Sequence, residues 1–166
     1  MQALVTDDLE LVLRWRDSGE STVRFALASG SEFTISGHVC WERGLNYQGE
    51  ATATFRTMCY GHDLNQFEVE LWKLSQGVAE SARFINTGGD LEIRISPREA
   101  NGCHVLLSEL RYRQFRLVGD VSCKSEFVLP VGVAEDVGRT AEAIRDLLRL
   151  LKVDCRSLFE LPKDPA

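Results

Sequence analysis

Residues 63–77 read DLNQFEVELWKLSQG, and this stretch decides how the chain is divided. Asp63 opens it with Gln66 three residues later, as in a capping box, and Gly77 closes it as a helix C-terminal glycine does. Its apolar residues recur at the spacing of one helix face, namely Leu64, Phe67, Leu71 and Leu74. We therefore predict a helix over residues 63–76, within a chain whose other patterns mostly repeat every two residues.

Strand patterns come before this helix, over residues 1–58. Leu11, Leu13 and Trp15 continue an alternation that begins at Leu9, which is typical of a half-buried strand. Residues 17–20 favour a turn, and residues 43–46 break the pattern again. The predicted N-terminal strands cover residues 9–15, 22–28, 32–42 and 50–58.

Strand patterns resume after the helix, over residues 80–133. Leu91, Ile93 and Ile95 alternate with charged residues until Pro97, where we expect the strand to end. Asn101-Gly102 is a strong turn dipeptide. The predicted strands cover residues 80–85, 91–95, 104–112, 114–121 and 126–133.

A second helix is predicted over residues 136–152, before a short tail over residues 153–166. Asp136 is a suitable N-cap, and the apolar stripe consists of Val137, Ala141, Ile144, Leu148 and Leu151. Together the patterns predict one α+β domain over residues 1–166. We expect a largely antiparallel β-sheet of about eight strands with two helices packed on it.

Composition and charge narrow the function classes. The chain has 166 residues, of which 44% are hydrophobic and 27% charged, as in a globular protein. With 25 acidic and 19 basic residues, its formal net charge is -6, which disfavours a nucleic-acid partner. Charged residues interrupt residues 1–15, so we expect no secretory signal, and no later window is apolar enough to span a membrane. The expected compartment is the cytoplasm.

Cysteine and histidine residues offer weak metal candidates. The odd number of cysteines and the lack of a CxxC pair predict reduced thiols, mostly in the core; they are Cys40, Cys59, Cys103, Cys123 and Cys155. His38-x-Cys40 and Cys59-x-x-His62 contain the ligand types that zinc prefers. Finger-type sites use CxxC knuckles, so we expect no metal here.

Motifs for catalysis are also missing. Cys103 and His104 adjoin on a predicted strand, where neighbours face opposite sides and cannot pair. The sequence contains no GxxxxGK[ST], GxGxxG or GxSxG motif. Gly88-Gly89 is expected in a hairpin turn, and Ser108 and Ser122 in strands. We therefore predict no enzymatic activity and no cofactor, and identify no catalytic residue.

Charged clusters have simple structural interpretations. We expect the acidic pairs Asp7/Asp8 and Glu68/Glu70 to lie on solvated edges. Residues 111–116, RYRQFR, interleave aromatic and basic side chains, as single-strand binders do. We expect this run to straddle a turn and to form a charged strand surface. The residues that would bind a partner are not identified by these patterns.

The stretch from Thr52 to Leu151 resembles the WapI-type bacterial immunity proteins and a related family of uncharacterised bacterial proteins. The order of elements carries the resemblance, and its matches are Phe67, Leu71 and Leu74 in the first helix, Leu91, Ile93 and Ile95, Gly102 to Val105, Phe127 to Val131, and the closing helix from Val137 to Leu151. Members of the family tend to carry an acidic residue and aromatic residues before the last helix. Here residues 132–137, GVAEDV, carry acids but no aromatic residue.

The resemblance implies a non-enzymatic protein that binds and neutralises a cognate toxin made by the same cell. Many toxin domains cut nucleic acids and are basic, so an acidic inhibitor would be steered to them. The alternative is an enzyme or small-ligand binder whose pocket brings His38, His62 or His104 together with carboxylates between sheet and helices. A third alternative is a subunit that acts through homodimerisation, with an exposed apolar edge strand.

Overall fold

The computed structural model describes residues 1–15, 21–41, 51–100, 102–118 and 121–155. The predicted turn at residues 17–20, the break at residues 43–46 and the tail beyond residue 155 lie outside the described residues. Within them, no helix is long and apolar enough to cross a membrane. The strands are β1 (Gln2–Val5), β2 (Leu11–Trp15), β3 (Ser21–Ser29), β4 (Glu32–Trp41), β5 (Ala51–Tyr60), β6 (Ala82–Ile85), β7 (Leu91–Ala100), β8 (Cys103–Val118) and β9 (Val121–Val133), and the helices are α1 (Gly61–Ser75) and α2 (Val137–Leu150).

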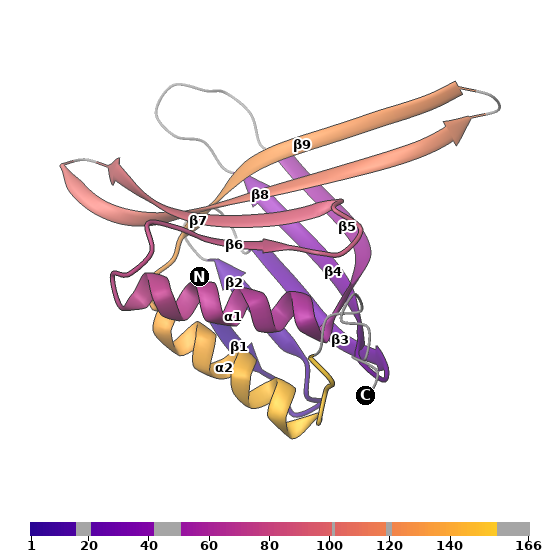
Figure 1. Ribbon diagram of the computed structural model, residues 1–166. Helices are drawn as coiled ribbons and strands as arrows, with labels where there is room; N and C mark the ends of the chain where they lie inside the picture. The colour runs from indigo at the N-terminus through magenta and orange to yellow at the C-terminus, as the bar shows by residue number, and fades with distance from the viewer. Residues whose placement is uncertain (16–20, 42–50, 101, 119–120, 156–166) are drawn as a thin grey trace, which may run out of the picture.

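The α+β class and the antiparallel pairing are confirmed, but the strands form two sheets and not one. Strands β1 to β5 pair in chain order in a five-stranded sheet, and β6 to β9 pair in chain order in a four-stranded sheet. Helix α1 separates β5 from β6 in the chain, so it interrupts what would otherwise be one continuous meander. Figure 1 shows both helices on one face of the five-stranded sheet, with the four-stranded sheet passing above α1.

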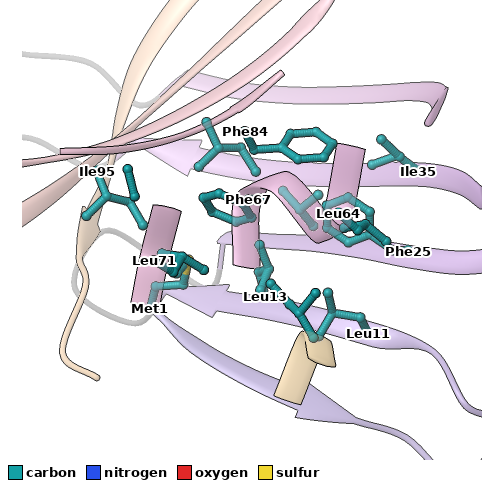
Figure 2. Packing of buried hydrophobic residues seen from close by; sticks show 14 of the residues in the cluster. Met1, Leu11, Leu13, Phe25, Ile35, Leu64, Phe67, Leu71, Phe84 and Ile95 are labelled. Atoms are coloured by element: carbon teal, nitrogen blue, oxygen red, sulfur yellow. The ribbon is translucent and has the colours of Figure 1, made fainter. Parts of the chain in front are cut away.

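One hydrophobic cluster joins both sheets and both helices. Phe84 from β6 meets the edge of Phe25 from β3, with ring centroids 5.5 Å apart, and lies 5.6 Å from Phe67 of α1. Figure 2 shows α1 between the sheets, with Phe67 toward Phe84 and Leu71 toward Met1. Since side chains from every layer are fully buried here, the layers form a common core.

Helix α1 begins two residues earlier than predicted. Its N-cap is Tyr60, and Asp63 is the third helical residue, whose carboxylate accepts a hydrogen bond from the Tyr60 amide at 2.9 Å. Gly61 allows this early start because a Cβ there would clash with the Val153 side chain. The predicted end is confirmed: Gly77 has φ +69°, and its amide bonds to the Leu74 carbonyl.

The second helix follows its prediction closely. Asp136 is the N-cap, and its carboxylate accepts a hydrogen bond from the Arg139 amide at 3.0 Å. Its buried residues include Val137, Ala141 and Ile144 of the predicted stripe. Helix α2 packs on α1 and on β1, a strand that the sequence patterns did not predict. Strand β1 is short and mostly exposed, so it carries little periodic signal.

Two strand boundaries were predicted wrongly in the four-stranded sheet. Strand β7 passes through Pro97 to Ala100, because β6 ends its pairing at Ile95 and leaves β7 without a neighbour on that side. At such an edge a missing N–H costs no ladder hydrogen bond. The expected strands 104–112 and 114–121 are mostly one continuous strand, β8, so no turn lies within residues 111–116. Figure 1 shows β8 and β9 extending together beyond the other elements.

Candidate functional site

The two Cys–His pairs do not meet. His38 and Cys40 share one face of β4, with His38 Nε2 3.1 Å from Cys40 Sγ. Cys59 pairs with Phe33 at the other end of β4, about 16 Å along the strand from His38. Within the described chain, no group of three or more His, Cys, Asp or Glu side chains is arranged to hold a metal ion.

The described thiols differ in their surroundings. Cys59 is fully buried, and burial, followed by the charge of Asp63, raises the pKa of its thiol. Cys155 is half-buried, and its thiol pKa is also raised by burial and then by Asp154. Cys40 is half-buried beside His38 and lies outside the core cluster. The expected core position is therefore right for Cys59 and wrong for Cys40.

His62 belongs to a polar network at the start of α1. Its Nε2 atom lies 3.1 Å from Asp63 Oδ1 and 3.2 Å from Thr87 Oγ1. The Asp63 carboxylate also accepts hydrogen bonds from the Thr87 amide at 3.1 Å and hydroxyl at 3.0 Å. A catalytic relay needs opposite nitrogens of the imidazole to face the nucleophile and the carboxylate. Here one nitrogen makes both contacts, so the network joins the β6–β7 turn to α1 structurally.

Asn86 continues this junction between the two sheets. Its side chain is buried in the β6–β7 turn and donates to the Met58 carbonyl of β5 at 2.8 Å and to Thr57 Oγ1 at 3.2 Å. Its carbonyl oxygen accepts from the Leu91 amide at 2.9 Å. Thr57 in turn donates to Asp90 at 2.7 Å. Each of these side chains holds backbone or a neighbour in place, which is a structural function.

The acidic pairs do not form a catalytic dyad. Asp7 and Asp8 are exposed in the β1–β2 turn, as expected. Glu68 was expected on a solvated edge, but it is buried against α2, where its carboxylate binds the Arg145 guanidinium. Glu70 accepts a hydrogen bond from the Arg83 amide at 2.6 Å. The two glutamates therefore fasten α1 to α2 and to β6, respectively.

The remaining sequence candidates also take structural positions. Gly88 and Gly89 lie in the β6–β7 hairpin turn, as expected, and Gly89 has φ +68°. Ser108 is buried in β8, and Ser122 lies at the start of β9. His104 is exposed near the start of β8, on a different sheet from His38. Leu64, Phe67 and the other buried side chains of the core cluster fill the space between the helices and the five-stranded sheet.

A surface groove lies between the end of α1 and the start of α2. Its volume is about 520 Å³, and its lining includes the Trp72 indole, Leu106 from β8 and the acidic residues Glu135, Asp136 and Glu142. The Trp72 side chain is 39% exposed, whereas the Trp15 side chain is fully buried. This groove combines an accessible aromatic ring with negative charge.

This groove could not be predicted from the sequence, for a physical reason. Trp72 lies off the apolar stripe of its helix, which is a visible signal for an exposed aromatic side chain. Its acidic neighbours come from residues 135–142, more than sixty positions away, so only the packing of α2 on α1 brings them together.

Comparisons with known proteins give no family assignment: no protein-family model, curated protein or solved structure matches the chain. The resemblance to immunity proteins therefore stays a prediction, and function must be argued from the surface of the molecule.

Proposed function

We propose that this protein is a non-enzymatic bacterial immunity protein that binds and neutralises a cognate toxin domain in the cytoplasm. The observation that carries the proposal is the acidic groove between α1 and α2, with Trp72 exposed in it. Buried interface centres are enriched in tryptophan, which supplies a large rigid contact area.

The Trp72 ring packs against an arginine side chain that restricts its movement. The Arg145 guanidinium carbon lies 5.1 Å from the centroid of the indole ring, a cation–π distance. Arg145 is itself bound by the buried carboxylate of Glu68. A ring that is fixed before binding loses little conformational entropy on contact with a partner. Trp72 is therefore suited to act as an anchor for a toxin surface.

The charge of the groove suits a basic partner. Glu135, Asp136 and Glu142 line it together with a single arginine, Arg139, whose Nε lies 3.2 Å from Asp136. The lining thus carries two net negative charges at neutral pH. A nuclease-type toxin is basic where it binds its substrate, so a lysine or arginine from that surface would be attracted into the groove.

The test is direct binding to the toxin domain encoded beside this gene. We expect the purified pair to associate, and co-expression to relieve the growth arrest that the toxin causes. Trp72→Ala should weaken binding by about thirtyfold, the effect of losing a central aromatic anchor. Leu150→Ala is the matched control, because Leu150 is an exposed residue of α2 that does not line the groove.

Charge reversal provides a second pair of variants. Glu142→Arg should weaken the complex and slow its association, since it removes one attraction and adds one repulsion. Asp146→Arg makes the same change one turn further along α2, outside the groove lining. Failure of the wild-type protein to bind or protect, or equal effects of both reversals, would contradict the proposal.

A further inference from the structure

The outward face of the four-stranded sheet carries a second surface of opposite charge, which we call the arginine face. Side chains alternate between the two faces of a strand, and the inward positions such as Phe84, Ile93 and Leu110 are buried. The arginine face consists of Arg83, Arg94, Arg98, Arg111 and Arg113, interleaved with Glu92, Glu109 and Glu126. It therefore has two net positive charges, although the chain as a whole has a net charge of -6.

Two arginines of this face lie directly opposite each other. Arg83 of β6 pairs in register with Arg94 of β7, and like charges in this relation destabilise a sheet. Arg83 is compensated by Glu92, whose Oε1 lies 2.7 Å from its Nε. Arg94 is exposed, and within the described chain it has no ion pair. Glu109 lies opposite Arg94 on β8, but its ion pair is with Arg98, at 3.8 Å. Among the described residues, Arg94 is therefore the member of the repulsive pair that makes no ion pair within 4 Å.

A hollow of about 400 Å³ opens at this pair. It is lined by Ser81, Arg83, Glu92, Arg94, Glu109, Arg111 and Val128. The mostly buried carboxylate of Glu92 contacts Arg83 through one oxygen and Arg111 Nη1 through the other, at 3.5 Å. Glu92 therefore fixes a guanidinium on each side of the hollow. The lining carries three positive and two negative charges, so one further carboxylate would neutralise it.

We propose that the arginine face is a docking surface for an acidic segment of a protein partner, with a carboxylate of that segment received between Arg83 and Arg94. Guanidinium groups bind carboxylates through paired, parallel hydrogen bonds. Exposed Ile85 and Val128 lie at the two ends of the row that contains Glu92 and Arg111, where they offer aliphatic contact to the same segment. Arginine beside exposed apolar side chains is typical of protein interfaces.

The same observations disfavour a nucleic acid on this face. Glu92, Glu109 and Glu126 alternate with the arginines and would repel a continuous run of phosphates. Tyr112 and Phe127 face the opposite side of the sheet, where both contact Phe55, so they offer no stacking platform outside.

This surface is separate from the groove proposed to bind the toxin, because the two linings share no residue. The proposal therefore does not depend on the immunity function. If binding at one surface is disproved, the proposal for the other surface still stands, since each surface is tested with its own variants.

The experiment uses the full chain and a fluorescein-labelled hexaglutamate peptide, followed by fluorescence anisotropy at about 50 mM salt, where surface charges are weakly screened. We expect the peptide to bind and Arg94→Ala to weaken binding by about fivefold or more. Arg94→Lys should restore only part of the loss, because it keeps the charge but not the paired hydrogen bonds. Arg56→Ala, an exposed arginine of β5, is the matched control.

Three further measurements decide the outcome. Amide chemical-shift changes on adding the peptide should be centred on β6 and β7. A hexauridylate oligonucleotide and inorganic phosphate should bind more weakly than the peptide. The proposal is overturned by peptide binding weaker than about 1 mM, by equal losses in Arg94→Ala and Arg56→Ala, or by tighter binding of the oligonucleotide. Folding of each variant is checked by its thermal unfolding.

Discussion

The aromatic ring of Phe55 lies directly over Gly37, its partner in the β4–β5 ladder. A Cβ atom at position 37 would lie within 3.0 Å of three atoms of that ring. The ring is not free to move aside, because it also stacks on Tyr112 of the other sheet with centroids 4.9 Å apart. Gly37 thus creates the space in which the five-stranded sheet meets β8.

Gly37→Ala should therefore destabilise the fold. The added methyl group must displace the Phe55 ring, and overpacking of this kind costs about 1–3 kcal/mol in the free energy of unfolding. Urea denaturation followed by tryptophan fluorescence measures the change. Gly138→Ala is the matched control, since a Cβ there would meet its nearest neighbour at an ordinary 3.5 Å and α2 would gain helix propensity. Equal stabilities of Gly37→Ala and the wild type would contradict the packing described.

Asn86→Ala should cost about 2–4 kcal/mol, because it removes the buried Asn86 side chain and leaves its hydrogen-bond partners on both sheets unsatisfied. The lost contacts include those to the Met58 carbonyl and from the Leu91 amide. Asn65→Ala provides the comparison, since Asn65 is exposed on α1. Chemical denaturation of the three proteins gives the ranking. If the two alanine variants are equally stable, the Asn86 network does not support the fold.

The elements that could be predicted from the sequence are those with local signals. Helix α2 could be predicted from its N-cap, Asp136, and from its apolar stripe. The end of α1 could be predicted from Gly77. Capping and periodicity are local signals because they act within a few residues. Pro97 shows where local reasoning fails. It usually ends a strand, yet whether it can be tolerated depends on the neighbouring strand, which ends at that level.

The surfaces were harder to predict than the elements. The sequence shows that the charged residues Glu92 and Arg94 alternate with apolar residues in β7. It also shows that Arg111 and Arg113 stand on either side of Tyr112 in β8. The placement of Arg83 opposite Arg94 depends on strand register, which is set by long-range pairing. The division into two sheets is equally non-local, because it depends on α1 packing against β6 as well as on the strands before it.

Reaction with iodoacetamide should distinguish the described thiols. Cys40 should be alkylated faster than Cys155, because burial and the Asp154 charge raise the pKa of the Cys155 thiol, and Cys59 should stay unmodified while the protein is folded. Burial and a raised pKa both deprive Cys59 of reactive thiolate. Mass spectrometry of peptides after timed labelling gives the rates, and labelling in urea serves as the control in which Cys59 becomes accessible. Modification of Cys59 as fast as Cys40 would show that the core opens locally.

Cys59 should also make stability depend on pH in the alkaline range. An unfolded thiol has a pKa of about 8.5, whereas burial and the Asp63 charge raise that of the folded Cys59 thiol. Below the unfolded pKa both states hold the proton, so the thiol contributes nothing to the pH dependence. Above it the unfolded state loses the proton and the folded state keeps it, so stability falls by about 1.4 kcal/mol for each pH unit.

Cys59→Ala should remove this dependence while leaving a small cavity. The stability gap between wild type and variant should therefore narrow between pH 7 and pH 10, measured by urea unfolding under reducing conditions. Val23→Ala is the matched control, because Val23 is also fully buried but carries no titratable group. Its gap to the wild type should stay constant with pH. A constant gap for Cys59→Ala as well would mean that the folded thiol ionises as readily as the unfolded one, which its burial against Phe33 and Asp63 does not allow.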